Sequence, residues 1–391
     1  MASRRWSTVS TGPLAGVRVV ELAGIGPAPF CAMHLADLGA DVIRVDRPNA
    51  IPASGPPERD LLNRNKRSVM VDLKNEAGAE VVLRLAEQAD VLIEGFRPGV
   101  AERLGIGPEQ CWERNPKLVY GRMTGWGQDG PLAHSAGHDI AYIGITGVLH
   151  AIGRKDGPPQ VPMNLVGDFG GGSLYLAVGI LAALRHAEQT GKGQVVDAAI
   201  VDGAAHLATM IYGLVSAGAW KPERGVNLLD TGAPFYDVYE TSDGEYMAVG
   251  PLESQFYKEF VRLLGLEGED LPKQLEIPRW PELRKRFAEV FATKTRREWT
   301  DIFEGTDACV APILSLSEAA QHPHIAARGT LVERDGFVQP APAPRFSDTS
   351  ADLRTPPAIP GQHTRDALAD WGFDDIDELL ASGAVQERND R

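Results

Sequence analysis

The sequence has few cysteines, no long apolar run and no recognisable export signal. Its three cysteines, Cys31, Cys111 and Cys309, are far apart, which predicts neither a disulfide framework nor a CxxC metal motif. The longest apolar run, residues 174–184, is too short to span a bilayer. Residues 1–11 carry two arginines but no apolar signal core. We therefore expect a soluble protein of a reducing cytoplasm, with no membrane partner.

Positive charge is also in deficit. The chain of 391 residues has 39 Lys and Arg against 53 Asp and Glu, a formal net charge of −14. This balance argues against a nucleic-acid partner, since nonspecific binding to phosphates needs a cationic surface. The average would equally disfavour a polyanionic small ligand, unless the cations are grouped. The length predicts two or three domains.

The N-terminal part alternates strand patterns with helix patterns. Residues 16–22 predict a buried strand, which a Gly/Pro-rich turn joins to a helix that ends near Asp37. Short connections of this kind favour a parallel sheet, and hence a doubly wound, Rossmann-like α/β domain. Further strands are predicted at residues 42–45, 68–72, 91–94, 118–122 and 194–198, and helices at 75–88 and 173–186.

The rest of the chain has a different texture. It predicts one long helix at residues 199–220, a hairpin at 236–240 and 246–250, a buried strand at 309–314, a Pro-rich crossing segment at 340–360, and two short helices at 364–380. This pattern is typical of a smaller α+β domain followed by a return to the first one.

The first turn offers one alternative function. Gly24 and Gly26 follow a strand, and Asp46 comes twenty positions after Gly26, as in a dinucleotide-binding fingerprint. The third glycine of that fingerprint is replaced by Pro29. An ordinary turn therefore explains the pattern better than a nicotinamide site does.

Basic residues recur where strands are predicted to end. Arg44 and Arg47 flank the end of the second strand, and Arg97 and Arg103 follow a later one. Ligands bind at the carboxyl ends of strands in such sheets, and arginine binds phosphate with two hydrogen bonds. A segment with a local charge of +3 lies between these pairs and contains Arg59, Asp60, Arg64, Lys66 and Arg67. We expect a phosphate-binding patch here, although each residue alone is typical of a solvated loop.

Two residues are candidates for acid–base chemistry. His138 lies in a Gly-His-Asp turn, and Asp168 precedes three glycines at the start of an apolar helix. Glycines let backbone approach a ligand, and a helix N-terminus favours developing negative charge. Taken singly, Asp168 is explained as a helix cap and His138 as a buried histidine. Together with the basic patch they indicate a site.

Several motifs resemble the class III CoA-transferase family along nearly the whole chain. They are residues 19–24, 38–46, 63–68, 72–74, 97–99, 124–128, 191–194 and 361–364. Three others, residues 137–139, 167–172 and 250–257, resemble the α-methylacyl-CoA racemase branch of that family.

The resemblance implies two interlocked chains, each with a large α/β domain and a smaller central α+β domain. It implies a large domain at residues 1–198, a linker at 199–235, a small domain at 236–325 and a return to the large domain at 326–391. The active site would lie between the large domain of one chain and the small domain of its partner. The CoA contacts that it implies are Arg47, Val71, Asp72, Leu73, Lys74, Gly95, Phe96, Arg97, Arg103, Gly137, Asp139, Ile140, Ala141 and Tyr142.

The resemblance also implies a reaction in which the carbon next to a thioester is inverted through an enolate. His138 and Asp168 would be the two acid/base groups, and Glu253 of the partner chain would orient His138. CoA enters as part of the substrate, and no metal or redox cofactor is expected. The alternatives are a CoA-transferase with Asp168 as nucleophile and a non-catalytic acyl-CoA-binding protein.

The acyl chain itself is left open: branched fatty, sterol side-chain and arylpropionyl thioesters all fit. Met210, Met247 and the apolar residues near Ile211 could line an acyl surface, but packing in the core explains each of them better.

Overall fold

The computed structural model describes residues 11–48 and 55–388. The stretch considered for an export signal lies outside these residues, apart from Thr11. The described chain divides into two units. Unit 1 contains residues up to 146, 163–207 and 329 onward, and unit 2 contains residues 147–162 and 208–328. Compared with the expected domains, residues 147–162 group with unit 2 and residues 199–207 with unit 1.

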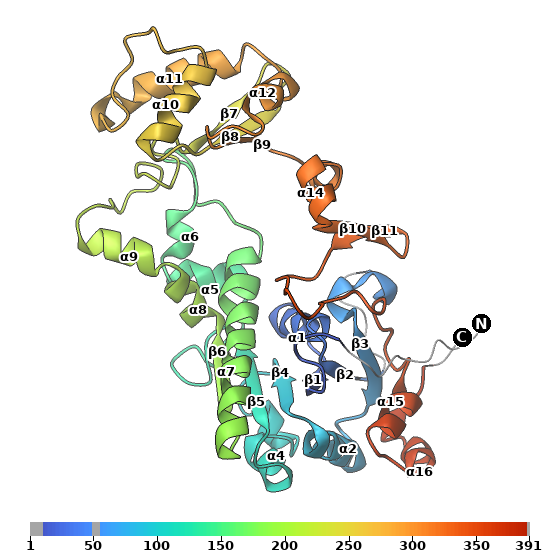
Figure 1. The fold of residues 1–391 in the computed structure, drawn as a ribbon. Helices are drawn as coiled ribbons and strands as arrows, with labels where there is room; N and C mark the ends of the chain where they lie inside the picture. The colour runs from blue at the N-terminus through green and yellow to red at the C-terminus, as the bar shows by residue number, and fades with distance from the viewer. Residues whose placement is uncertain (1–10, 49–54, 389–391) are drawn as a thin grey trace. The chain divides into compact units, whose positions relative to one another are not determined.

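Unit 1 is built on a seven-stranded sheet within the described residues, in the order β12-β3-β2-β1-β4-β5-β6 (Figure 1). The first six strands in the chain run parallel, and β12 joins the edge antiparallel to β3. The predicted doubly wound α/β fold is confirmed. The strands are β1 (Arg18–Leu22), β2 (Asp41–Asp46), β3 (Lys66–Val71), β4 (Val91–Glu94), β5 (Val119–Thr124), β6 (Val195–Ala199) and β12 (Val385–Gln386).

Each face of this sheet has its own core. Successive side chains of a strand point to opposite faces, so Val19 and Val20 belong to different clusters. One face packs against α2 (Glu76–Gln88), α3 (Val100–Arg103), α4 (Pro108–Arg114), α15 (Thr364–Asp370) and α16 (Ile376–Ala381). The other packs against α1 (Pro27–Asp37) and α7 (Leu174–Thr190).

The remaining elements of unit 1 are short. They are the 3-10 turns Pro57–Arg59 and Leu61–Asn63, α5 (Asp139–Ile145), a π-helical segment (Leu165–Ser173), α8 (Ile200–Leu207), and the hairpin of β10 (Leu331–Arg334) and β11 (Phe337–Pro340).

One helical run, Leu165–Thr190, is long and apolar enough to cross a membrane by length and composition alone. It is longer than the apolar stretch considered above because the π-helical segment leads directly into α7. In this structure Leu176, Ile180 and Ala183 of the run pack against the sheet as part of the core.

Unit 2 has a three-stranded antiparallel sheet, in the order β7-β8-β9, around a core of aromatic side chains. The predicted hairpin is present as β7 (Asp237–Glu240) and β8 (Tyr246–Val249). Its other elements are α6 (Val148–Ala151), α9 (Thr209–Ser216), α10 (Ser254–Leu263), a 3-10 turn (Ile277–Arg279), α11 (Trp280–Phe291), α12 (Arg296–Phe303), β9 (Val310–Pro312), α13 (Leu316–Ala319) and α14 (Pro323–Arg328).

Two sequence predictions fail here. The long helix predicted at residues 199–220 is two helices, α8 and α9, which break at Ala208, where the units divide. The residues next to Ala208 in the sequence include no proline or glycine that would predict this break. The strand predicted as buried at residues 309–314 is the short edge strand β9, whose central residue Ala311 is exposed.

Candidate functional site

A cavity of about 950 Å³ lies at the carboxyl edge of the large sheet. Its walls include the segments that follow four neighbouring strands: residues 23–29 after β1, Arg47 after β2, 95–98 after β4 and 125–126 after β5. This edge is where a parallel sheet collects the loops that bind ligands. All of the residues that line the cavity belong to unit 1.

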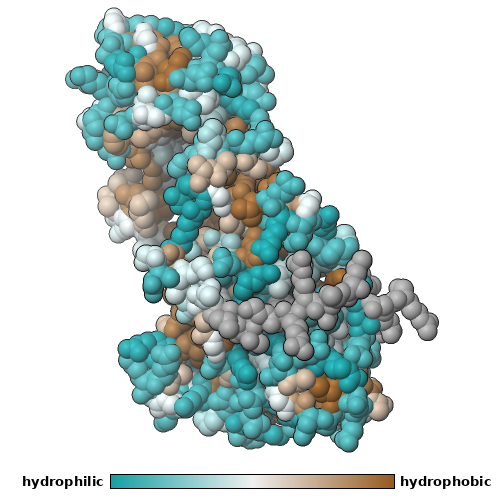
Figure 2. Space-filling model, turned by 45° about the vertical axis from the view of Figure 1, so that its right-hand side comes forward, coloured by the Kyte–Doolittle hydropathy of each residue, from teal (hydrophilic) through white to brown (hydrophobic). Residues whose placement is uncertain are grey.

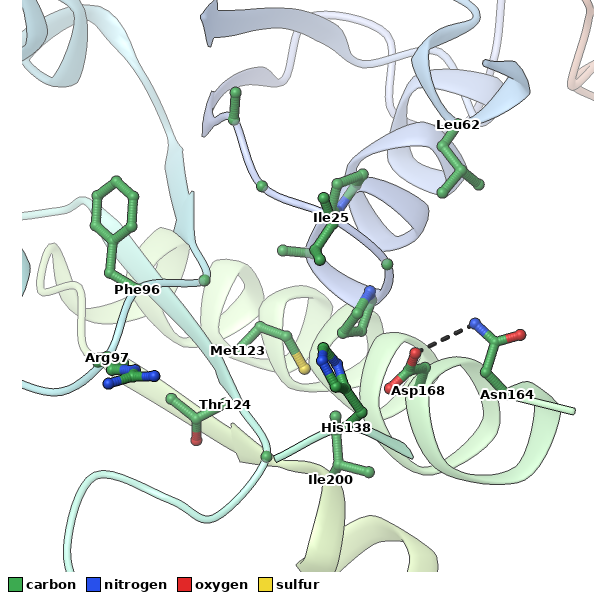
Figure 3. A pocket seen from close by; sticks show the side chains of 18 of the residues that line it. Ile25, Leu62, Phe96, Arg97, Met123, Thr124, His138, Asn164, Asp168 and Ile200 are labelled. Carbon is green, nitrogen blue, oxygen red and sulfur yellow. Dashed lines mark hydrogen bonds between the residues drawn. The ribbon is translucent and has the colours of Figure 1, made fainter. Parts of the chain in front are cut away.

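His138 and Asp168 face this cavity from two different elements (Figure 3). His138 is exposed and caps the N-terminus of α5, and its imidazole makes no hydrogen bond within the part of the chain that is described. Asp168 is half-buried in the π-helical segment. The two residues are thirty positions apart in the sequence, yet they are close enough for His138 to lower the pKa of Asp168. The cavity therefore holds one imidazole and one carboxyl group together.

Two neighbours hold Asp168 in place. The Nδ2 of Asn164 donates to Oδ2 of Asp168 at 3.2 Å, the bond drawn in Figure 3. The backbone N–H of Asp168 donates to Oδ1 of Asp139 at 2.7 Å. Burial raises the pKa of Asp168, the hydrogen bond from Asn164 opposes that rise, and the charge of Asp139 adds to it. The protonated form of Asp168 is thereby favoured relative to an exposed aspartate.

The glycines after Asp168 have a packing role. A Cβ on Gly171 would lie 2.6 Å from the backbone nitrogen of Ala204 in α8, and one on Gly172 would lie 3.0 Å from Ile200. These glycines let α8 pack closely against the π-helical segment, and neither lines the cavity; that they bring backbone near a ligand stays a prediction. Gly26 is the glycine that adjoins the carboxyl group, because its Cβ would lie 3.4 Å from Oδ2 of Asp168.

The model of CoA-transferase family III matches residues 14–364. The chain belongs to this family. A solved CAIB/BAIF family protein from Brucella suis has the same fold, with a TM-score of 0.80 and 28% identity over 92% of this chain and 100% of that chain.

Two curated members of the family indicate the range of its activities. The chain is 47% identical over 363 residues to the Homo sapiens protein named alpha-methylacyl-CoA racemase, which covers 92% of this chain and 94% of that protein. It is 30% identical over 401 residues to the Mus musculus succinyl-CoA:glutarate CoA-transferase, which covers 97% of this chain and 91% of that protein.

The CoA contacts that the family resemblance implied fall into two groups. Six of them line the cavity: Arg47, Gly95, Phe96, Arg97, Gly137 and Tyr142. The others, all in the described part of the chain, are not among the lining residues: Val71, Asp72, Leu73, Lys74, Arg103, Asp139, Ile140 and Ala141. Val71 ends β3 at the same sheet edge, and Arg103 is exposed at the end of α3.

The structure corrects the expectation that the cations of residues 59–67 form a phosphate-binding patch. Arg64 pairs with Asp37 at 2.5 Å, Lys66 with Glu21 at 2.5 Å, and Arg67 with Asp41 at 2.6 Å, and all three basic side chains are buried. Arg59 lies over the ring of Phe337, 4.4 Å from its centroid. These charges hold the fold together, and the arginines that line the cavity are Arg44, Arg47 and Arg97.

The first turn does not provide a nicotinamide site. The carboxylate of Asp46 is fully buried, accepts a hydrogen bond from Ser68 at 2.6 Å and pairs with Arg44. It is thus occupied within the protein, and the ribose contact that the fingerprint requires is not open. Pro29 lies in the first turn of α1.

The remaining predicted residues lie in unit 2. Glu253 is the residue before α10, and its role toward His138 stays a prediction. Met247 is completely buried among the aromatic side chains of that unit, so of its two predicted alternatives core packing is confirmed. Met210 is 59% exposed on α9 and stays a candidate for such a surface.

Sequence reasoning missed three residues that shape the site. Asn164 donates a hydrogen bond to Asp168. Glu94 accepts a hydrogen bond from the backbone N–H of Phe96, and Arg122 forms an ion pair with Glu94. The sequence did contain a signal for Glu94, because this acid directly follows the apolar residues of a predicted buried strand. Asn164 had no such signal.

Proposed function

We propose that the protein is a racemase or epimerase of 2-methylacyl-CoA thioesters. One observation carries this proposal: His138 and Asp168 face the same cavity from separate elements. Inversion of a carbon needs one group to remove a proton from one face and another to return a proton to the opposite face. The 47% identity to a protein named alpha-methylacyl-CoA racemase supports this choice within the family.

In the proposed reaction, one of the two groups takes the α-proton as the C–H bond breaks. The electron pair forms a C=C bond, and the thioester carbonyl oxygen becomes an enolate oxygen. The second group then gives its proton to the other face of the carbon, and the carbonyl re-forms. His138 and Asp168 exchange roles when the substrate is the other epimer. The raised pKa of Asp168 supports its part as the acid.

The enolate needs donors that face its oxygen. We infer that backbone N–H groups at the cavity, near the Gly-rich turn after Asp168, supply them. The phosphates of CoA would bind Arg47 and Arg97, which are both exposed and line the cavity. Proton transfer of this kind uses no metal or redox cofactor.

We also propose that the enzyme acts as a homodimer, with Glu253 of one chain orienting His138 of the other. A stripe of apolar side chains along α7 supports a second copy: Leu174, Val178 and Leu181 are 44%, 66% and 38% exposed in the single chain. They recur at helical spacing and therefore share one face. Figure 2 shows hydrophobic side chains, in brown, at the surface on one face of the single chain.

CoA transfer is the second candidate, because the family contains proteins named CoA-transferases and because Asp168 could attack a thioester. The test is to incubate the protein in D₂O with one epimer of a 2-methylacyl-CoA. Racemisation with deuterium at the α-carbon, and with no acceptor acid present, is expected. Strict dependence on an added carboxylic acid would establish transfer instead, and CoA binding without either reaction would indicate a binding protein.

Two variants test the assignment of the acid/base groups. His138→Ala and Asp168→Asn are each expected to lower the epimerisation rate by about 10²–10⁴-fold, while CoA still binds. Full epimerisation by His138→Ala would remove the two-base mechanism. Loss of CoA binding in both variants would show that they had damaged the cavity itself.

A further inference from the structure

One buried carboxylate shapes the loop that brings Phe96 and Arg97 to the cavity. Glu94 is the last residue of β4 and is 3% exposed. Its Oε2 accepts the backbone N–H of Phe96 at 2.6 Å. Residues 95–98 line the cavity, and Figure 3 shows Phe96 and Arg97 on this loop, away from Asp168. The shape of the loop therefore depends on a hydrogen bond to Glu94.

Arg122 contacts the residues on both sides of this loop. On one side, the Nε of Arg122 lies 3.5 Å from Oε1 of Glu94, the residue before the loop. On the other, its Nη2 bonds to Glu102 in α3, the helix that follows the loop. Its Nη1 donates to Gln128 at 2.8 Å. A single guanidinium group thus contacts carboxylates before and after residues 95–98.

The groups around Glu94 set its charge. Arg122 and Tyr120 approach it from β5, Glu102 from α3 and Asp197 from β6. Burial raises the pKa of Glu94, the Phe96 N–H and Arg122 lower it, and Glu102 and Asp197 raise it. The pKa that results is about 7. Glu94 therefore changes charge close to neutral pH. Protonation would weaken both its bond to Phe96 and its attraction to Arg122.

We propose that Glu94 is a positioning residue for CoA: its carboxylate, held by Arg122, keeps residues 95–98 in the shape that presents Phe96 and Arg97 to the ligand. This inference rests on the proposed function, in which CoA occupies the cavity. Glu94 does not line the cavity and takes no part in proton transfer. It acts on affinity, whereas His138 and Asp168 act on the chemical step.

Calorimetric titration with 3′-dephospho-CoA tests the proposal. This ligand is chosen because it lacks the phosphate monoester, which itself titrates near pH 6. The wild type is expected to bind about three- to tenfold more weakly at pH 6 than at pH 8, the range of one ordinary hydrogen bond. Glu94→Gln is expected to bind at both pH values as the wild type does at pH 6. With substrate, this variant should raise KM and leave kcat unchanged.

The matched control is Glu80→Gln. Glu80 lies on α2 and forms an exposed ion pair with Arg114 of α4, so this variant also removes a paired carboxylate. It should bind as the wild type does at both pH values. If Glu94→Gln does not fold, Glu102→Gln gives the same information from an exposed position. Because the charge of Glu102 raises the pKa of Glu94, its removal should move the change in affinity to lower pH.

The outcomes separate the two proposals. A folded Glu94→Gln variant with the affinity and pH dependence of the wild type overturns the positioning role and leaves the racemase proposal intact. An unchanged midpoint in Glu102→Gln also overturns it. Binding that depends on Glu94, without deuterium exchange at the α-carbon, overturns the racemase proposal alone. No binding of CoA to the wild type overturns both.

Discussion

The carboxylate of Asp139 accepts the backbone N–H of Asp168 at 2.7 Å, so the residue that follows one proposed acid/base group fixes the position of the other. A glycine makes this approach possible, since a Cβ on Gly167 would lie 2.2 Å from that same Asp139 oxygen. The second oxygen of Asp139 is buried and has no hydrogen-bond partner in the described chain. Asp139 thus couples α5 to the π-helical segment directly at the site.

This coupling predicts a change in pH dependence. Asp139→Asn keeps an oxygen that can accept the Asp168 N–H but removes a charge that raises the pKa of Asp168. The pKa of Asp168 should therefore fall. For the epimer from which Asp168 removes the proton, the low-pH limb of kcat/KM should move to lower pH. Asp139→Ala, which also removes the acceptor, should lower kcat/KM by about 10–100-fold. If the low-pH limb of kcat/KM stays at the wild-type pH in Asp139→Asn, the charge of Asp139 does not raise the pKa of Asp168 as argued.

The contact between α8 and the π-helical segment predicts a severe glycine substitution. A Cβ on Gly203 would lie 1.8 Å from the carbonyl oxygen of Gly171, and backbone cannot move aside cheaply. Gly203→Ala should lower the free energy of unfolding by at least about 1–3 kcal/mol. Gly213→Ala on α9 is the control, because a Cβ there meets nothing within 4 Å. It should be neutral or raise that free energy by up to about 1 kcal/mol. Chemical denaturation measures both, and equal effects would refute the packing argument.

The buried pair of Lys66 and Glu21 predicts a loss that a second substitution recovers. Both side chains are fully buried, and the Nζ of Lys66 also donates to the carbonyl of Pro29 at 2.9 Å. Lys66→Met leaves Glu21 without its partner and should cost about 3–5 kcal/mol of unfolding free energy. The double variant with Glu21→Gln should regain part of it. Lys74→Met, at an exposed site, should stay within about 0.5 kcal/mol of the wild type.

The apolar stripe on α7 predicts the assembly state. Val178→Asp places a charge in the middle of the proposed contact and should shift the protein from dimer to monomer in sedimentation experiments. Arg114→Asp changes a charge on α4, which packs on the other face of the sheet, and should leave the dimer intact. Epimerisation should fall together with dimer content, because Glu253 would come from the partner. A fully active monomer would rule out that arrangement.

The sequence predicted most of unit 1 because strand and helix periods there agree with the turn residues between them. It also predicted which edge of the sheet holds the cavity, since Arg47 and Arg97 each follow a strand. The break at Ala208 could not be seen, because the apolar pattern continues across it and no capping residue interrupts it.

The roles of the charged residues could not be predicted from local sequence. Arg67 and Arg97 look equally suited to phosphate, yet Arg67 pairs with Asp370, 303 positions away, and Arg97 stays exposed at the cavity. Which acid a buried cation meets is decided by the tertiary fold. The same holds for Glu94, whose raised pKa arises from burial and from neighbours on three other elements.

The edge strand β12 sets an order for folding during synthesis. It covers the free edge of β3, and the side chains of His363 and Thr364 accept the backbone N–H groups of Ser68 and Met70 in that strand. Until these residues have left the ribosome, β3 presents an unpaired strand edge, which is a template for wrong pairing. The two chain segments of unit 2 are complete well before that point. The unit made from residues 147–162 and 208–328 can therefore fold first, and the sheet that bears the cavity is complete only after residues 385–386 have emerged.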